Sequence, residues 1–258
     1  MHQISPAWLL LILFITGCEP SLDDYTANEA LTRSTSSWQA YGGPGGTKFA
    51  QLNQIDKQNV ADLEVAWVYR TGDVSTVFQS SPIIVEGQLV FCTPYNKVIA
   101  LDPLTGGELW KFDPEIKLDA KPANEFNCRG IASRQEPGEQ HCSAQIFTAT
   151  NDARLIALDA KTGKRCDTFG DSEEVDLSRG GGKILWDGEY QVTSPPAVLS
   201  NLVIVGSAVS DGNRVEAPSG VVRAFDAKSG ELVWAFDLAP PGFDYINRPV
   251  SEHGYALG

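Results

Sequence analysis

The sequence predicts an all-β protein, and the architecture it favours is a β-propeller of four-stranded antiparallel blades. A phrase that begins Ala-x-Asp and runs on to Thr-Gly or Ser-Gly occurs three times, starting at Ala100, Ala157 and Ala224. Short segments rich in β-branched and aromatic residues recur between turn residues. No amphipathic helix longer than about three turns can be recognised. Repeated units that are too small to bury their own faces are typical of β-propellers and β-solenoids.

Each copy of the phrase predicts a β-hairpin. An apolar residue precedes Asp102, Asp159 or Asp226, the following Thr-Gly or Ser-Gly turns the chain, and a second strand begins. Glycine favours such a turn because it adopts positive φ without strain, and Asp accepts hydrogen bonds from turn amides. The first and third copies end in a Trp that can pack between neighbouring units. The middle copy has Cys166 and Asp167 where the Trp is expected, so we expect its blade to dock more weakly or through other contacts.

The predicted strands are short and are bounded by Gly, Pro, Asn or Asp. They cover residues 65–69, 82–85, 88–92, 98–101, 145–148, 155–158, 196–199, 203–206, 222–225 and 233–236. This number of strands makes about two and a half to four blades.

The composition argues against nucleic-acid binding. The chain has 258 residues, a formal net charge of −13 and an isoelectric point near 4.6, and it has no basic stripe to neutralise phosphates. High solubility is the simplest meaning of this acidity. The sequence also lacks a dinucleotide-binding or phosphate-binding glycine loop and a Gly-x-Ser-x-Gly nucleophile elbow.

The N-terminus predicts export. Residues 7–15 form an apolar run that is too short to span a bilayer but suits the core of a signal peptide. Ile15-Thr16-Gly17-Cys18 follows and resembles a bacterial lipobox, in which Cys18 would be lipidated. We therefore expect residues 1–17 to be a lipoprotein signal peptide, 18–37 a flexible tether and 38–258 the propeller portion. The protein would face the periplasm, anchored by lipid to a membrane, expected to be the outer one. An ordinary cleaved signal or a buried strand is the alternative.

Export permits disulfide bonds between the remaining cysteines, which are Cys92, Cys128, Cys142 and Cys166. Cys128 and Cys142 bracket a polar loop that contains Gly and Pro, so they are the favoured pair, although spacing alone does not determine connectivity. A zinc site is not expected, because no two cysteines have metal-ligand spacing.

A series of local phrases in family order carries a resemblance beyond the repeat. The phrases are Trp38–Gly43, Cys92-Thr-Pro94, Cys128-Arg-Gly130, Thr193-Ser-Pro-Pro196 and Pro218–Asp226. Together with the Trp-ended repeat, they resemble the pyrroloquinoline-quinone (PQQ) dehydrogenases, nearest the membrane-bound glucose dehydrogenase branch. The likeness covers about residues 38 to 258. It implies an eight-bladed quinoprotein propeller, of which this chain holds about the first half.

The resemblance implies roles for four positions. Arg129 of the Cys-Arg-Gly phrase is expected to contact a PQQ carboxylate, because a guanidinium fork suits that group. Thr150 is expected to contact the cofactor too. Gln79 stands where relatives carry an acidic cofactor contact. Asp211 is the candidate metal or PQQ ligand, since Ca²⁺ or Mg²⁺ prefers carboxylate oxygen. The alternatives are a structural salt bridge for Arg129, a strand threonine for Thr150 and a turn aspartate for Asp211.

The function implied by the resemblance is PQQ-dependent oxidation of a sugar or alcohol hydroxyl, with electrons passing to ubiquinone or a cytochrome. In the family the catalytic base lies in the second half of the propeller, so we expect this chain to be an N-terminal fragment and assign no catalytic residue to it. Glucose itself is a doubtful substrate, because the multi-helix membrane domain of that branch is replaced here by the lipobox. The competing hypothesis is a non-enzymatic outer-membrane lipoprotein propeller that acts as an assembly scaffold. A decayed enzyme is a third.

Overall fold

The structure confirms the all-β prediction. It is a computed structural model that describes residues 38–43, 46–50, 52–73, 77–136, 142–210, 212–214 and 217–237. These residues contain strands β1 to β14 and a short 3₁₀ helix, η2 (Val60–Asp62). Among them, no helix has the length and apolar character needed to cross a membrane.

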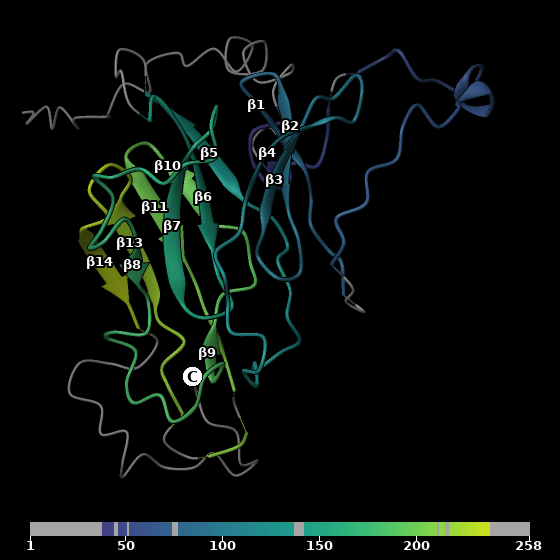
Figure 1. Cartoon of the computed structure of the whole chain (residues 1–258). Coiled ribbons are helices and arrows are strands. Elements are labelled where there is room, and N and C mark those ends of the chain that lie inside the picture. The colour runs from purple at the N-terminus through teal and green to yellow at the C-terminus, as the bar shows by residue number, and fades with distance from the viewer. Residues whose placement is uncertain are drawn as a thin grey trace, which may run out of the picture.

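Three four-stranded antiparallel sheets form the blades. Within each sheet, every strand is hydrogen-bonded to the strand that follows it in the blade, so the order across the sheet is the order along the chain. The strands are β1 (Ile83–Val85), β2 (Gln88–Cys92), β3 (Val98–Leu101) and β4 (Glu108–Phe112); β5 (Ala132–Gln135), β6 (Ala144–Ala149), β7 (Arg154–Asp159) and β8 (Val175–Asp176); and β10 (Ala197–Leu199), β11 (Leu202–Val205), β13 (Val222–Asp226) and β14 (Leu232–Phe236). Figure 1 shows the three sheets side by side in this order.

A fourth, smaller sheet lies beyond one end of the blades. It pairs β9 (Tyr190–Gln191) with β12 (Ala208–Val209), so the chain leaves the third blade after β11 and returns to it at β13. In Figure 1, β9 lies below the second and third sheets.

Apolar contacts between blades form the core. One cluster joins the first and second blades, through residues such as Val90 and Ile156, and another joins the second and third, through residues such as Phe147 and Val203. Because the second blade is covered on both faces, every residue of β6 is buried. Burying one such large side chain stabilises the fold by roughly 1.5–3 kcal/mol. Blade-on-blade burial therefore replaces the single core of an ordinary domain.

The repeated phrase forms the predicted turn between the last two strands of each blade. In the first blade, Asp102 Oδ1 accepts hydrogen bonds from the backbone amides of Leu104 (2.8 Å) and Thr105 (3.0 Å). These two bonds, the one from Thr105 first, lower the pKa of Asp102. The same pattern recurs at Asp159 and Asp226.

Trp110 of the first copy packs on the turn of the second blade, and Trp67, which lies before the first blade, packs on the turn of the first. Trp67 donates from Nε1 to the carbonyl of Pro103 (3.0 Å), and Trp110 donates to the carbonyl of Ala160 (3.2 Å). In the middle copy, which lacks the Trp, the backbone N–H of Gly170 donates to the carbonyl of Ser229 in the next turn (2.8 Å). The second blade thus docks on the third through contacts other than a Trp, which was one of the two outcomes expected for it.

One predicted strand is wrong. Residues 65–69 are extended but pair with no strand among the described residues. The β-rich composition that suggested a strand serves another purpose: Trp67 and Tyr69 pack against an apolar cluster of the first blade, while Val65 and Val68 face solvent. The other nine segments all contain strand residues. The structure adds β4, β5 and three two-residue strands to them.

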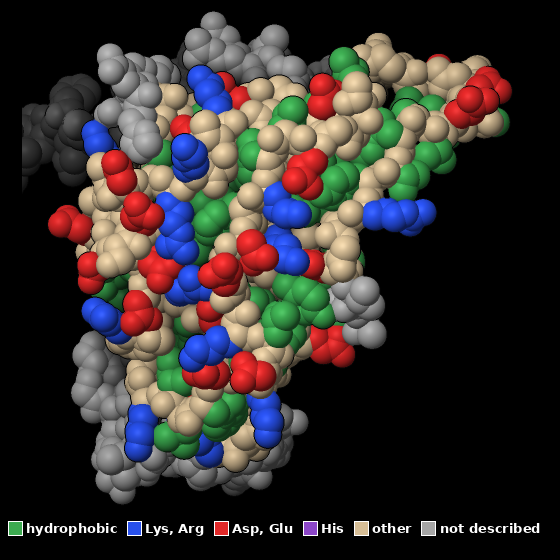
Figure 2. Space-filling model, viewed as in Figure 1, with side chains coloured by type: hydrophobic (Ala, Val, Ile, Leu, Met, Phe, Trp, Pro, Cys, Tyr) green, Lys and Arg blue, Asp and Glu red, His purple; other side chains and the backbone are tan. Residues whose placement is uncertain are grey.

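The outer surface carries mixed charge. On the face in Figure 2, lysine and arginine side chains alternate with aspartate and glutamate. The last strand, β14, is exposed along its whole length, and its Trp234 is 39% exposed although Trp110 at the matching position of the first blade is partly buried. An apolar strand edge is thus open beyond the third blade of the described chain.

Candidate functional site

Three chain segments, one leading into the first strand of each blade, converge at one end of the described sheets. The backbone N–H of Ser81 donates to the carbonyl of Arg129 (3.1 Å), and the N–H of Arg129 donates to the carbonyl of Thr193 (3.0 Å). Ser81 also forms a parallel bridge with Gly130. A Cβ on Gly130 would lie 3.2 Å from Pro195 Cγ, so a larger residue would crowd this junction. These contacts bring residues far apart in sequence into one place.

Arg129 lies at the centre of this junction. Its Nε donates to Gln79 Oε1 (3.1 Å), and its Nη1 donates to Thr193 Oγ1. Nη2 has no partner among the described residues, and Arg129 forms no ion pair with a described carboxylate. The structural salt bridge considered for Arg129 is therefore not found within this part of the chain, and its positive charge is uncompensated there.

Gln79 supports Arg129 and joins it to a buried asparagine. Its Oε1 also accepts from Asn127 Nδ2 (2.8 Å), and its Nε2 has no partner in the described part of the chain. Asn127 is buried, and its Oδ1 makes no hydrogen bond to any described residue. The junction thus presents a cation, an amide donor and an orphan amide oxygen side by side.

Thr150 is close to this group but not part of it. It is fully buried in the turn between β6 and β7, where its Oγ1 donates to Asp152 Oδ1 (2.5 Å) and accepts from the N–H of Arg154 (3.0 Å). Its carbonyl accepts from the N–H of Val192 (3.2 Å), which precedes Thr193. The structure therefore brings Gln79 and Arg129 together and leaves the Thr150 hydroxyl engaged in its own turn. Its cofactor contact stays a prediction.

Asp211 and Cys18, the candidates for metal binding and lipidation, lie outside the described residues. Next to Asp211, the N–H of Ser210 donates to the carbonyl of Glu189 (2.8 Å). Within the described ranges, no three His, Cys, Asp or Glu side chains cluster as a metal site would require.

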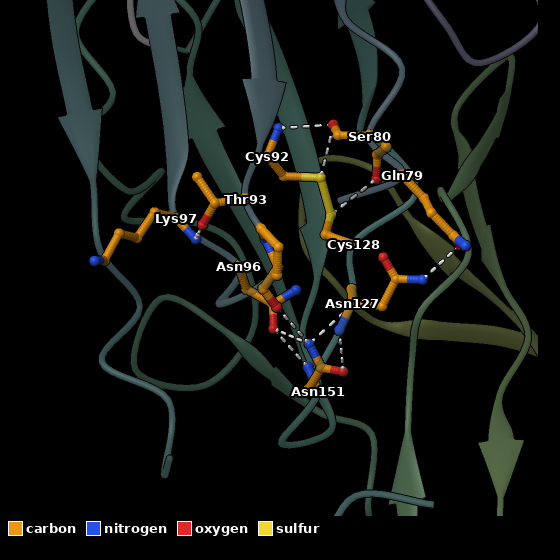
Figure 3. The surroundings of a disulfide bond; sticks show 11 residues. Gln79, Ser80, Cys92, Thr93, Asn96, Lys97, Asn127, Cys128 and Asn151 are labelled. Atoms are coloured by element: carbon orange, nitrogen blue, oxygen red, sulfur yellow. Dashed lines mark hydrogen bonds between the residues drawn. A yellow bond between two sulfur atoms is a disulfide. The ribbon is translucent and has the colours of Figure 1, made fainter. Parts of the chain in front are cut away.

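The favoured disulfide pair is wrong. Cys92 bonds Cys128, and Cys142 bonds Cys166, with a Cα–Cα distance of 6.0 Å in each. The reason is burial: Cys92 and Cys128 face the cluster between the first two blades, whereas Cys142 and Cys166 face the cluster of the second and third. Figure 3 shows the first bond, with Gln79 and Ser80 beside it and three asparagines near its Cys128 end.

That disulfide fixes the backbone beside Arg129. Cys92 ends β2, and its N–H donates to Ser80 Oγ (3.2 Å), next to Gln79. Cys128 precedes Arg129 in sequence. A covalent bond therefore joins the Arg129 segment to the end of β2, and a hydrogen bond from that end of β2 holds the segment that carries Gln79.

The positive charge of nearby Lys97 is balanced by a carboxylate. Its Nζ donates to Asp73 Oδ1 (2.6 Å). This hydrogen bond raises the pKa of Lys97, while burial opposes the rise. Lys97 is thus a cation with a carboxylate partner, unlike Arg129.

A crevice of about 970 Å³ lies beside the second and third blades, away from the junction. Its cations are ion paired, Arg154 with Asp152 (2.7 Å) and Glu174 (3.2 Å), and Arg179 with Asp176 (3.0 Å). Size alone does not mark the functional site, because these groups already satisfy one another. The uncompensated Arg129 is the better anion site.

Thr193, Asn127 and Asn151 were missed by the sequence analysis as site residues. Thr193 opens the Thr-Ser-Pro-Pro phrase, which was used as a family signal but given no role. Asn127 directly precedes the Cys-Arg-Gly phrase. Asn151 carries no sequence signal, because a buried amide is defined by its partners.

Comparisons with known proteins all point to one family of dehydrogenases. The family model described as "PQQ: Glucose/ethanol/alcohol dehydrogenase, beta-propeller domain" matches residues 38–256. The chain is 36% identical over 224 residues to quinoprotein glucose dehydrogenase A of Acinetobacter calcoaceticus, covering 78% of this chain and 28% of that protein. It is 34% identical over 238 residues to the quinate/shikimate dehydrogenase (quinone) of Acinetobacter baylyi, covering 83% of this chain and 29% of that protein.

A solved structure supports the same likeness. The quinohemoprotein alcohol dehydrogenase from Comamonas testosteroni superposes with a TM-score of 0.66 at 26% identity, over 83% of this chain and 29% of that one. The chain therefore spans less than a third of the length of each of these relatives.

Proposed function

The chain belongs to the PQQ family of glucose, ethanol and alcohol dehydrogenase β-propeller domains, and from that premise we propose that it forms part of a quinoprotein oxidoreductase. The reaction is the oxidation of a sugar or alcohol hydroxyl. The observation that carries the proposal is the uncompensated Arg129 guanidinium at the junction of three blades, beside the free Gln79 amide nitrogen.

The residues present fit PQQ, which is a planar quinone with three carboxylates. Arg129 Nη2 and Gln79 Nε2 are donors without partners among the described residues, and donors of this kind suit a carboxylate. The orphan Oδ1 of Asn127 is buried beside them and requires a partner that the described residues do not provide. An anionic ligand with several polar groups would satisfy all three.

Arg129 would hold a carboxylate of the cofactor, and Gln79 would orient Arg129 while donating a hydrogen bond of its own. Thr193 fixes the other side of the guanidinium. Thr150 and Asp211 are further contacts that we propose from the family likeness, with Asp211 as a ligand of Ca²⁺ or Mg²⁺. When bound, PQQ would supply a hydride acceptor for the oxidation, and a metal held at Asp211 would supply Lewis-acid chemistry. We assign no catalytic base to the described residues.

The N-terminal sequence and the disulfides support a proposal for the cellular setting. Two disulfide bonds fit an oxidising compartment. We propose that the protein is exported, lipid-anchored through Cys18, and active at the periplasmic face of a membrane, with ubiquinone or a cytochrome as the electron acceptor.

Titration calorimetry tests this function. PQQ with Ca²⁺ is titrated into the full-length product of the reading frame that contains this chain. Tight, metal-dependent binding that weakens at least tenfold in Arg129→Ala supports the proposal. Arg179→Ala is the matched control, because Arg179 is an exposed arginine paired with Asp176, and its affinity stays unchanged. A folded protein that does not bind PQQ overturns the proposal and favours the scaffold hypothesis.

A further inference from the structure

A cluster of buried amide side chains lies behind Arg129. Asn96, Asn127, Asn151 and Gln191 are all 3% exposed or less. They come from the turn after β2, the segment before β5, the turn after β6 and strand β9. Figure 3 shows Asn96 and Asn127 converging from separate segments on Asn151.

Asn151 is the centre of this cluster and uses its whole hydrogen-bonding capacity. Its Nδ2 donates to Asn96 Oδ1 (2.5 Å) and to the carbonyls of Asn127 (3.1 Å) and Pro94 (3.4 Å). Its Oδ1 accepts from Gln191 Nε2 (2.7 Å) and from the N–H of Asn127 (3.4 Å). Its own N–H donates to Asn96 Oδ1 (2.9 Å).

The partners of Asn151 lead to residues of the site. Asn127 donates to Gln79 and lies two positions before Arg129, so the Asn151 contacts to both the N–H and the carbonyl of Asn127 hold that segment in place. Gln191 lies two positions before Thr193, which holds the other side of the guanidinium. Thr150 is the chain neighbour of Asn151.

We propose that Asn151 is a positioning residue of the PQQ site, whose single amide holds the segments that carry Gln79, Arg129 and Thr193 in one arrangement. This inference rests on the proposed function. Only an amide suits the position, because it must donate to carbonyls on one side and accept from N–H groups on the other. Without the hydrogen bonds of this amide, we expect the side chains of Gln79, Arg129 and Thr193 to move apart.

The variant Asn151→Asp tests the role with a minimal change of shape. At pH 8 the introduced carboxylate can accept but cannot donate, so we expect the affinity for PQQ to fall at least tenfold. Below about pH 5 a protonated carboxyl can donate again, and burial moves this transition to higher pH. The affinity of the variant should therefore recover, relative to wild type, as the pH falls.

Thr148→Val is the matched control. Thr148 lies in β6, three positions before Asn151, is fully buried, and its hydroxyl has no partner. Its replacement should leave the affinity and its pH profile unchanged. If Asn151→Asp fails to fold, Gln191→Met removes the bond to Asn151 Oδ1, together with the one that Gln191 Oε1 accepts from the N–H of Asn124, and should weaken binding about threefold.

Hydrogen exchange measured by mass spectrometry without PQQ provides a second readout. Peptides that contain the N–H groups of Ser81 and Arg129 should exchange faster in Asn151→Asp but not in Thr148→Val. Normal PQQ binding, an unchanged pH profile and unchanged exchange in Asn151→Asp would overturn the positioning role. A wild-type protein that does not bind PQQ would instead overturn the proposed function, while the exchange experiment would still decide whether Asn151 orders the junction.

Discussion

The Trp110 indole of the first blade lies so close over Gly163 of the second that a Cβ on Gly163 would approach Trp110 Cε3 to 2.3 Å. The same relation holds one blade earlier, where a Cβ on Gly106 would lie 2.5 Å from Trp67 Cδ2. Glycine is required at these turns for two reasons: the backbone has positive φ, and the neighbouring ring occupies the space of a side chain.

Gly163→Ala separates these two reasons. Gly163 has φ +68° and Gly87 has φ +74°, but a Cβ on Gly87 would meet nothing within 4 Å. We expect Gly87→Ala to lower the free energy of unfolding by about 1 kcal/mol, from backbone strain alone. Gly163→Ala should cost about 1–3 kcal/mol more, because the indole must move. Urea denaturation measures both, and equal losses would show that the ring adapts freely.

The two disulfides should have different effects on binding. Their cysteines are separated by 36 and 24 residues, so loss of either bond should destabilise the protein by about 2–5 kcal/mol. Only the Cys92–Cys128 bond lies beside Arg129. The double variant Cys92→Ala/Cys128→Ala should weaken PQQ binding, whereas Cys142→Ala/Cys166→Ala should not. Calorimetry below the melting temperature of both variants would make this comparison. Equal affinities would show that the first bond does not hold the site.

Tyr69 should titrate late. Burial, and then its hydrogen bond to Glu108, raise the pKa of Tyr69 from 10.0 to about 12. Since the folded-state pKa lies above the unfolded one, the stabilisation is complete below pH 10 and is lost as the pH rises through about 12. Phenolate absorbance should show a late-titrating tyrosine that is absent in Tyr69→Phe. In Glu108→Gln, which removes the charge, it should ionise earlier. The prediction fails if Tyr69→Phe leaves the late step in place.

A buried ion pair should stabilise the small sheet of β9 and β12. Arg214 Nε donates to Glu189 Oε1 at 2.5 Å, and the Glu189 side chain is 0% exposed. Arg214→Met leaves that charge unpaired and should cost about 3 kcal/mol of unfolding free energy. The double variant Arg214→Met/Glu189→Gln should recover part of the loss in thermal denaturation. A double variant less stable than the single one would show that Arg214 acts through other contacts, such as its bond to the Lys183 carbonyl.

The blade architecture could be predicted because its signals are local. An Asp that binds the amides two and three residues later, followed by Gly, defines a turn within a few residues, and all three copies form it. Residues 65–69 show the limit of this reasoning. Their β-rich composition includes two aromatic side chains that pack on a blade, and sequence alone does not distinguish that arrangement from strand pairing.

The site could be predicted only in part, because its contacts are long-range. Gln79 and Arg129 were found through the family phrases, and the structure joins them by a hydrogen bond. The disulfide pairing depended on which core each cysteine faces, which sequence spacing does not reveal. Asn151 was missed because its five partner groups lie in the turn after β2, the segment before β5 and strand β9.

The hydrogen bonds from Ser81 to Arg129 and from Arg129 to Thr193 have a consequence for biosynthesis. Strands within a blade are neighbours in sequence, so a blade can pair its strands soon after it leaves the ribosome. The junction cannot form until residue 193 has emerged, more than a hundred residues after Gln79. During that interval the Arg129 segment has no partner from the third blade. Translation therefore completes the sheets of the first two blades, which end at Asp176, before the junction can close.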